Sequence, residues 1–259
     1  MDRTFNTPEE NLACDEALLD LCEEGQGPEI LRFWKPENYF VVAGYSNKIQ
    51  TEIHAEKCKK QGIPILRRPS GGGTVLQGPG CLNYSLILKI DRHPEFKTIT
   101  SATRFIMETH AKALTVILRP KAEESTNGSF ATLRMTKEMT SEIQVQGISD
   151  LTLGGLKFSG NAQRRKQHAF LFHGTFLLNF DISAIESLLA APSRQPAYRK
   201  DRLHSQFLTN LNLPSKTIQE ALIQEWKALE KFPPQALFLD KISSLVEEKY
   251  SHPEWNFKF

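Results

Sequence analysis

Residues 67–75 read Arg-Arg-Pro-Ser-Gly-Gly-Gly-Thr-Val, which places two arginines directly before three consecutive glycines. Glycine has no Cβ, so a run of three leaves backbone N–H groups open to close approach by a ligand. Such amides can hold an anion or lie along an extended acyl chain, and the guanidinium groups add positive charge. The run therefore predicts a binding loop, with a flexible turn between two strands as the alternative.

A second candidate is Lys157, which lies in the stretch Gly-Gly-Leu-Lys-Phe-Ser-Gly at residues 154–160. Side chains alternate between the two faces of a strand, so Leu156 and Phe158 share one face and Lys157 lies on the other. A lysine there supplies a compact cation that can contact a carboxylate or a phosphate. A surface lysine on a half-exposed strand is the alternative.

These segments resemble the lipoate–protein ligase A family and the wider biotin/lipoate ligase superfamily. The resemblance is carried by RRPSGGGTV at 67–75, KFSGNAQR at 157–164, HGT at 173–175 and RFWKPENYFVVAGYSN at 32–47. It runs from about residue 10 to residue 181 and fades beyond residue 211. It implies an α+β fold of the class II biotin/lipoate-ligase type, with a mixed β-sheet flanked by helices.

The activity that the resemblance implies is ATP-dependent, AMP-forming ligation of lipoate or octanoate to protein, with Mg²⁺ as cofactor. The acyl carboxylate attacks the α-phosphorus of ATP to give acyl-AMP and pyrophosphate, and a lysine of a lipoyl carrier domain then takes the acyl group. Because two anions must be brought together, cationic and N–H donors are needed in a water-poor site. The implied partners are lipoyl domains of 2-oxoacid dehydrogenase complexes or the glycine cleavage H protein.

The resemblance assigns the catalytic role to Lys157, which in the family contacts both the acyl carboxylate and the α-phosphate. Asp150 matches a residue near the adenylate and Mg²⁺, with an Asx turn as the alternative, and Arg68 matches the family's ligand-binding arginine. Neighbouring strand residues face opposite sides, so we expect Arg67 to be a surface ion-pair partner. The remaining substrate and nucleotide contacts that the motif implies are Ser70, Gly71, Gly72, Gly73, Thr74, Val75 and Leu76.

Some positions depart from the family pattern. Gln77 and Gly78 stand where the family often has His-Asp, which removes a carboxylate near the nucleotide, and Ser149 replaces the family's asparagine. His173 fits the motif, but we assign it no chemical role, because a lone histidine on a buried strand is more often a hydrogen-bonded core residue. The basic run at 164–166 is either a solvated turn or a patch that steers an acidic carrier domain.

Other functions remain open. Relatives that transfer octanoyl groups from a carrier protein work through a cysteine thioester, which requires a reactive thiol, and this chain has no cysteine after Cys81. A lipoyltransferase that accepts preformed lipoyl-AMP would use the same pocket. A non-catalytic relative that binds lipoyl domains is favoured only by the departures at residues 77, 78 and 149, and biotin is a further substrate within the superfamily.

The composition indicates an ordinary soluble enzyme of 259 residues, 40% hydrophobic and 24% charged, with a net charge of +2. This charge argues against nucleic acid as a partner, because phosphate binding needs a concentrated basic surface. No apolar stretch approaches the ~20 residues of a membrane span, and the acidic start lacks an export signal, so we expect a cytoplasmic protein. The four cysteines show no metal-type spacing, which predicts reduced thiols.

The elements that must position these residues follow from the hydrophobic pattern. We expect helices at 8–24, where Thr7 and Glu10 form a capping box, and at 51–61 and 98–118. Strands are expected at 63–67 and 81–90, on either side of the glycines, and as a hairpin formed by 29–35 and 39–43. Short strands follow over 142–179, after a polar loop at 121–141 that is either a lid or a solvated excursion.

We expect one catalytic domain over 1–259, mainly helical from about residue 182, with helices around 215–232 and 236–250. Larger bacterial ligases place an accessory domain after the catalytic one, and few residues follow Lys157 here. The resemblance therefore implies that adenylation depends on a separate small accessory protein.

Overall fold

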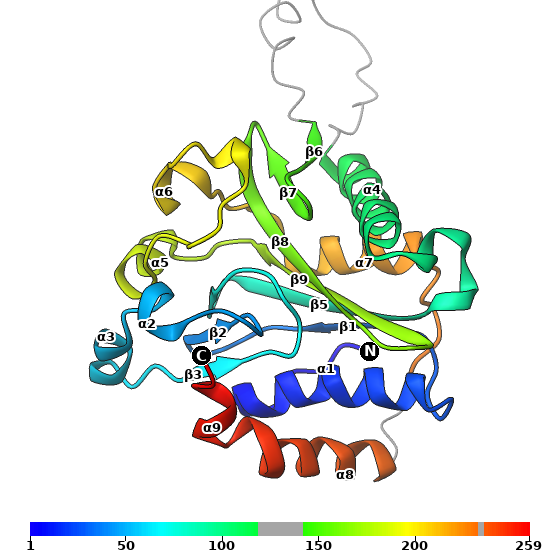
Figure 1. Ribbon diagram of the computed structural model, residues 1–259. Helices are drawn as coiled ribbons and strands as arrows, with labels where there is room; N and C mark the ends of the chain where they lie inside the picture. Colours follow the sequence, from blue (N-terminus) through cyan, green and yellow to red (C-terminus); the bar gives the residue numbers. More distant parts are fainter. Residues whose placement is uncertain (119–141, 233–235) are drawn as a thin grey trace, which may run out of the picture.

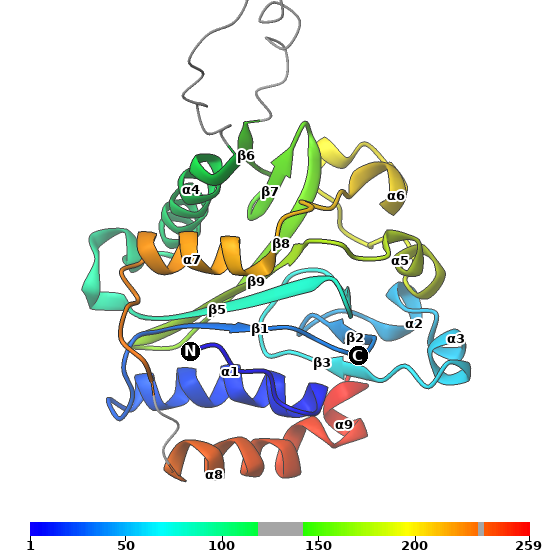
Figure 2. The ribbon, with the colours of Figure 1, turned by 180° about the vertical axis from the view of Figure 1, so that it is seen from behind.

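The computed structural model describes residues 1–118, 142–232 and 236–259. Two β-sheets form its centre and helices pack around them (Figures 1 and 2). This arrangement confirms the α+β class with a sheet flanked by helices. The expected loop or lid at 121–141 lies outside the described residues, and the single domain over 1–259 stays a prediction.

The larger sheet has six antiparallel strands in the order β1-β5-β9-β8-β7-β6. They are β1 (Ile30–Trp34), β5 (Cys81–Lys89), β6 (Ile143–Gln146), β7 (Asp150–Leu153), β8 (Leu156–Arg165) and β9 (Ala169–Leu177). The register between β7 and β8 shifts after Leu151, which pairs with Ser159, so that Thr152 pairs with Lys157. Such an irregularity bends a strand pair and redirects side chains, and here it lies beside the predicted catalytic lysine.

The smaller sheet has β2 (Phe40–Ala43) at its centre, parallel to β3 (Ile65–Arg67) and antiparallel to β4 (Val75–Gln77). The glycine run thus connects two strands, β3 and β4. The hairpin predicted from residues 29–35 and 39–43 is wrong, because β1 pairs with β5 in the larger sheet while β2 belongs to the smaller one. Both strands exist, but they belong to different sheets.

Helices cover both faces of the larger sheet. On one face α1 (Pro8–Glu23) packs against the sheet and α8 (Ala236–Leu245) packs on the outer side of α1, and on the other face lie α4 (Ile99–Leu118) and α7 (Ser215–Glu225) (Figures 1 and 2). Along β1, Leu31 and Phe33 join the core that contains residues of α4 and α7, whereas Ile30 and Trp34 join the core of α1 and α8. Because both faces are covered, all five residues of β1 are buried.

A third core lies between the smaller sheet and short helices. The predicted helix at 51–61 is wrong in its bounds, because the chain bends at Ile53 and His54, where the His54 N–H donates to the Leu188 carbonyl at 2.9 Å. Two helices result instead of one. The shorter helical elements are α2 (Ile49–Glu52), α3 (Ala55–Lys60), η1 (Ile90–Arg92), η2 (Pro94–Lys97), α5 (Ile182–Leu188), η3 (Ala197–Arg199), α6 (His204–Phe207), η4 (Val246–Tyr250) and α9 (Pro253–Asn256).

The start of α1 forms as its sequence predicts. Thr7 Oγ1 accepts a hydrogen bond from the Glu10 N–H at 3.2 Å, and the Glu10 carboxylate accepts one from the Thr7 N–H at 2.9 Å. These bonds satisfy two of the N–H groups that a helix start otherwise leaves unpaired. The capping box is therefore confirmed.

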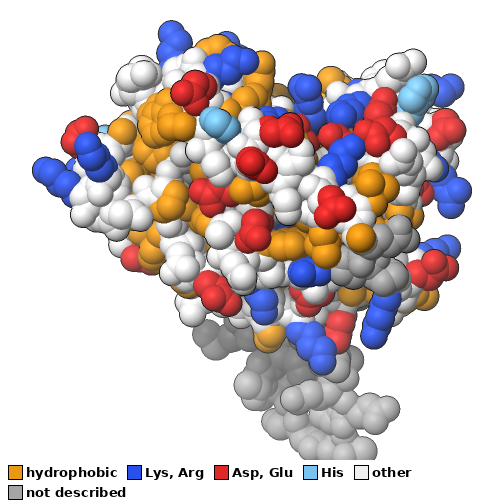
Figure 3. Space-filling view, turned by 90° about the horizontal axis from the view of Figure 1, so that it is seen from below, with side chains coloured by type: hydrophobic (Ala, Val, Ile, Leu, Met, Phe, Trp, Pro, Cys, Tyr) orange, Lys and Arg blue, Asp and Glu red, His pale blue; other side chains and the backbone are white. Residues whose placement is uncertain are grey.

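The surface mixes charges of both signs. On the face seen from below, where α8 and α9 lie, lysine and arginine side chains are interspersed with aspartate and glutamate (Figure 3). This mixture agrees with the small net charge of +2. Of the helices in the described ranges, none is long and apolar enough to cross a membrane.

Candidate functional site

A pocket of about 1130 Å³ lies between the glycine run of the smaller sheet and strands β7, β8 and β9 of the larger one. Its remaining wall is the segment 192–208, which follows α5 and includes η3 and α6. Apolar side chains, among them Leu12, Trp34 and Val42, line it together with charged groups. A pocket of this size and mixed lining suits a small-molecule substrate.

The glycine run forms one wall, and Arg68 fixes its shape. Arg68 Nη2 donates hydrogen bonds to the carbonyls of Gly71 and Gly73, both at 2.7 Å, and Nε donates to Ser70 Oγ at 3.1 Å. Burial lowers the pKa of Arg68 to about 10, which still leaves it protonated at neutral pH. Gly72 adopts a φ of +87°, in the left-handed region that favours glycine. Arg68 therefore holds the loop in its curved form.

Arg67 is the clearest correction to the expected site. It is fully buried rather than a surface ion-pair partner. Its Nη1 donates to the carbonyls of Gly44, Tyr45 and Asn47 at 2.8 to 3.0 Å, and its Nε donates to the Trp255 carbonyl at 3.2 Å. The alternation rule correctly separates the two arginines, but the second face of β3 is covered by the 44–47 loop and α9 instead of by solvent.

Glu52 is a pocket residue that the sequence analysis missed. Its Oε2 accepts hydrogen bonds from Thr74 Oγ1 at 2.7 Å and Asn47 Nδ2 at 2.8 Å, and its Oε1 accepts from Ser193 Oγ at 2.6 Å. Burial raises the pKa of this carboxyl, but the hydrogen bonds outweigh it and the pKa is lowered on balance. The carboxylate ties three segments together, and no glycine or charge pattern marks it in the sequence.

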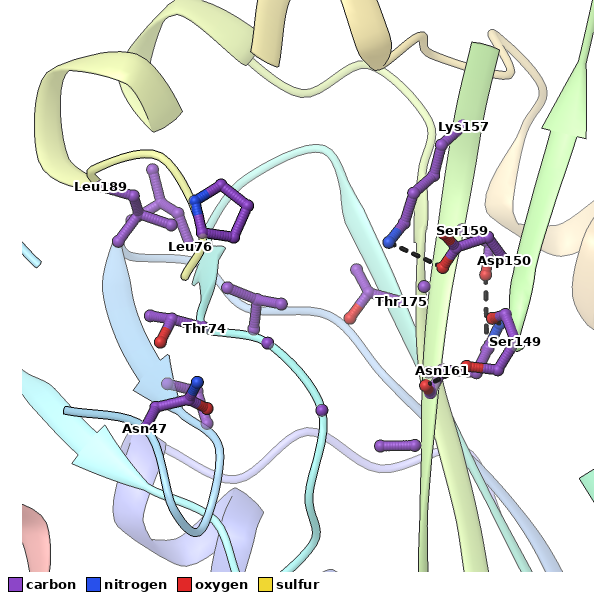
Figure 4. Close-up of a pocket in the computed structure, with 18 of the residues that line it drawn as sticks. Asn47, Thr74, Leu76, Ser149, Asp150, Lys157, Ser159, Asn161, Thr175 and Leu189 are labelled. Atoms are coloured by element: carbon purple, nitrogen blue, oxygen red, sulfur yellow. Dashed lines mark hydrogen bonds and ion pairs between the residues drawn. The ribbon is translucent and has the colours of Figure 1, made fainter. Parts of the chain in front are cut away.

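Lys157 and Asp150 face each other on the opposite wall. Lys157 Nζ lies 2.8 Å from Asp150 Oδ1, and Tyr198 Oη donates to Asp150 Oδ2 at 2.7 Å. The lysine side chain points into the space opposite Leu76 and Leu189 (Figure 4). Burial and the neighbouring Asp150 raise the pKa of Tyr198, so the phenol stays protonated and donates. An ammonium group held in this way can stabilise a developing negative charge in the pocket.

Ser149, which departs from the family pattern, has a structural role. Its Oγ donates to the Asn161 carbonyl at 2.6 Å, and Asn161 Nδ2 donates to the Ser149 carbonyl at 2.7 Å. Tyr84 Oη donates to Asn161 Oδ1 at 2.7 Å. These bonds fix the turn before β7 against β8 and so keep Asp150 beside Lys157.

Most of the predicted site residues lie in this pocket. Ser70 and Gly71 do not line it. Ser70 Oγ instead bonds His173 Nε2 at 2.6 Å, and burial, with the positive charge of Arg68, lowers the pKa of His173 to about 4. His173 is thus neutral at physiological pH. The predicted residues that do line the pocket are Arg68, Gly72, Gly73, Thr74, Val75, Leu76, Asp150 and Lys157.

The predicted Mg²⁺ site at Asp150 does not fit the residues around it. Both carboxylate oxygens are already engaged, one by Lys157 and one by Tyr198. Within the described residues no group of three His, Cys, Asp or Glu side chains could hold a metal ion. Mg²⁺ and ATP as cofactors stay predictions.

Comparison with known proteins shows similarity to octanoyltransferases. The chain is 32% identical over 281 residues to octanoyltransferase LipM of Geobacillus kaustophilus, covering 100% of this chain and 97% of that protein. It is 30% identical to octanoyltransferase LipM of Bacillus subtilis, covering 97% and 95%. These relatives contradict the expected ATP-dependent, AMP-forming ligase. The missing cysteine near Lys157 therefore did not separate the two activities.

Solved structures agree on the fold. A lipoate–protein ligase A bound with ATP superposes with a TM-score of 0.75 at 24% identity, covering 99% of this chain and 96% of that one. A bi-partite lipoate protein ligase from Thermoplasma acidophilum superposes with a TM-score of 0.76 at 22% identity, covering 99% and 94%. At these identities the likeness establishes the fold alone.

The family model of the lipoyl protein ligase A/B catalytic domain matches residues 7–227. This match includes the glycine run, Lys157 and the segment 192–208, so it covers every wall of the pocket. The resemblance noted in the sequence is thereby confirmed: the chain belongs to the lipoyl protein ligase A/B catalytic domain family.

Proposed function

We propose that this protein transfers an octanoyl group from an activated acyl donor to the ε-amine of a lysine on a lipoyl carrier domain. Similarity over nearly the whole length of octanoyltransferases LipM supports the reaction. The observation that carries the proposal is the Lys157 ammonium, held by Asp150 on the wall of a large, partly apolar pocket. The lipoyl protein ligase family, and the solved lipoate protein ligase with its E2 lipoyl domain, support a lipoyl domain as the carrier, with H protein as a further candidate.

The chemistry requires one bond to form and one to break. The carrier amine attacks the acyl carbon, a C–N bond forms, and the bond from that carbon to the donor's leaving group breaks. With a thioester donor, the amine gives up a proton and the departing thiolate gains one, while the carbonyl oxygen carries negative charge in between. A fixed ammonium such as Lys157 stabilises that charge more in the transition state than in the ground state.

The acyl chain needs an apolar place beside this cation. Leu12, Trp34 and Val42 line the same pocket, and each of them is at least nine-tenths buried. Burying methylene groups against such side chains stabilises binding by about 0.8 kcal/mol for each group. The pocket therefore combines chain recognition with charge stabilisation.

Transfer is proposed to be direct, without an acyl-cysteine intermediate. All four cysteines of the chain are buried, and none is among the residues that line the described pocket. Burial raises the pKa of Cys14 and of Cys81 to about 12 and that of Cys22 to about 11. Thiols with such pKa values carry almost no thiolate at neutral pH. The carrier amine must then meet the donor's acyl carbon in one complex.

The test supplies the purified protein with an unmodified lipoyl domain and one of three octanoyl sources. These are octanoyl thioester on an acyl carrier protein, octanoyl-AMP, and free octanoate with ATP and Mg²⁺. Intact mass spectrometry of the lipoyl domain measures transfer. We expect octanoylation from at least one activated donor, and its loss in Lys157→Ala.

Lys241→Ala is the matched control. Lys241 Nζ also pairs with a carboxylate, at 2.7 Å from Glu24, and its side chain is about as exposed as that of Lys157, but it lies outside the pocket. It should retain wild-type transfer. Modification from free octanoate and ATP but from neither activated donor would overturn the proposal, and so would binding of the lipoyl domain without any modification.

A further inference from the structure

The segment 192–208 contributes a buried cation to the pocket that neither the motifs nor the transfer chemistry uses. Arg199 lines the pocket, although the residue is only 6% exposed. It lies at the end of η3 and follows Tyr198, which bonds Asp150. Arg199 therefore stands on the Lys157 side of the pocket.

The orientation of Arg199 is fixed by its own turn. Arg199 Nε donates to the Arg202 carbonyl at 3.0 Å, and Arg202 Nε donates back to the Arg199 carbonyl at 3.0 Å. Lys200 and Asp201 between them both adopt positive φ angles, +52° and +56°. The Arg199 guanidinium also lies 4.8 Å from the centre of the Phe207 ring. These contacts hold the guanidinium before any ligand arrives.

The outer face of that guanidinium has no protein partner within the described residues. Neither Nη atom makes a hydrogen bond there, and no carboxylate lies within ion-pair distance. Asp150 on that wall already bonds Lys157 and Tyr198, and Asp201 of the same turn accepts from Gln195 Nε2 at 2.6 Å. Arg68, by contrast, uses both of its Nη groups on backbone carbonyls. A buried cation without a partner is costly, so its two Nη groups are suited to a ligand anion.

We propose that Arg199 binds a phosphate group of the acyl donor, an inference that rests on the proposed transfer function and specifies its donor. The planar fork of arginine matches phosphate oxygens with two parallel N–H donors. Lys157 and His204 line the same pocket and add no negative charge. The acyl carbon then lies toward Lys157 and the phosphate toward Arg199. Both a phosphopantetheine thioester and an acyl-adenylate contain such a phosphate.

The test measures binding and needs no turnover. Isothermal titration calorimetry compares 4′-phosphopantetheine with pantetheine, and AMP with adenosine, on the whole chain. The wild-type protein should favour the phosphorylated member of one pair by on the order of ten- to a hundredfold, as for charge-assisted hydrogen bonds. Arg199→Gln should abolish that preference, and Arg199→Lys should retain part of it. The pair that shows the preference identifies the donor.

The matched control is Lys200→Gln, which removes the same charge from the next, exposed residue and should leave the preference unchanged. Circular dichroism melting verifies that each variant folds. If Arg199→Gln does not fold, the phosphate preference of Arg199→Lys is compared with that of the wild type instead. A phosphate preference that persists in Arg199→Gln, or a wild-type protein without one in either pair, would overturn the inference. Phosphate-dependent binding without octanoyl transfer would sink the proposed function and leave the Arg199 site standing.

Discussion

The two walls of the pocket use buried charged residues in opposite ways. On the glycine-run wall, Arg68 and Glu52 make their hydrogen bonds to the protein itself, to backbone carbonyls or to neighbouring hydroxyl and amide groups. Arg67 does the same behind that wall, on the other face of β3. On the other wall, Lys157 points into the pocket and Arg199 has Nη groups without a described partner. The first wall is built like a core, and the second like a binding surface.

The comparison distinguishes buried charged side chains that stabilise the shape of the pocket from those that can bind a ligand in it. Arginine and glutamate in a binding motif are easily taken for ligand contacts, yet a buried polar group must first be satisfied. Where backbone carbonyls satisfy it, substitution should mainly reduce the free energy of unfolding. Where a ligand must satisfy it, substitution should mainly reduce activity. The following predictions test this division.

Lys157→Met should have the largest effect. Removing a charge-stabilising donor should lower the rate of transfer by about 10²- to 10³-fold, while the melting temperature stays close to that of the wild type. Transfer kinetics and thermal melting measure the two effects on the same preparation. A large loss of stability with only a small loss of rate would mean that Lys157 mainly stabilises the fold.

Arg67→Met should show the reverse pattern. It removes the hydrogen bonds that Arg67 donates to four backbone carbonyls, which should reduce the free energy of unfolding by about 3 kcal/mol or more. Urea unfolding measures this, with Arg164→Met, an exposed arginine of β8, as the control. If Arg67→Met abolished transfer without reducing the free energy of unfolding, Arg67 would act in binding or transfer and not in stabilising the fold.

Glu52→Gln should change how stability depends on pH. The folded pKa of Glu52 lies below its ordinary value of 4.5, so its carboxylate stabilises the fold fully above pH 4.5 and less as the pH falls through the folded pKa. The variant should be less stable than the wild type at pH 7, and the difference should shrink below pH 4.5. Urea unfolding across this pH range would contradict the idea if the difference stayed constant.

Tyr198→Phe should have the smallest effect. It removes one hydrogen bond to Asp150 but leaves the Lys157 ion pair in place. We expect a several-fold change in transfer, in line with about 1 kcal/mol for one hydrogen bond. Tyr45→Phe, on the exposed side of the 44–47 loop, is the control. A loss as large as that of Lys157→Met would mean that Tyr198 takes part in the reaction.

Local residue patterns predict most of the helices and strands but not which strands pair with one another. The capping box at Thr7, the long helix α4 and the strands β3 and β5 follow from residue patterns alone, whereas β4, which directly follows the glycines, was missed. The pairing of β1 with β5 does not, because hydrophobic alternation indicates a strand without indicating its partner. The burial of Arg67 was missed for the same reason, since its cover comes from α9, far along the chain.

The site was predictable only where glycines marked it. The glycine run and Lys157 lie in recognisable motifs. Glu52 lies in a predicted helix that carries no functional motif, and Tyr198 and Arg199 lie in a polar segment that carries none. The choice between ligase and transferase was wrong because both activities need a pocket for an acyl chain and a nearby cation. Those shared requirements leave the same residues in the sequence.

The contacts of α9 also determine how late in its synthesis the chain can complete the pocket. Trp255 Nε1 donates to the Arg67 carbonyl and Asn256 Oδ1 accepts from the Arg67 N–H, across 188 and 189 residues of chain. At roughly 5–20 residues per second, the ribosome makes these partners about 10–40 s after Arg67. Throughout that interval β3, the strand that leads into the glycine run, lacks its hydrogen bonds to Trp255 and Asn256. A nascent chain therefore cannot present a complete pocket to donor or carrier before synthesis is nearly over.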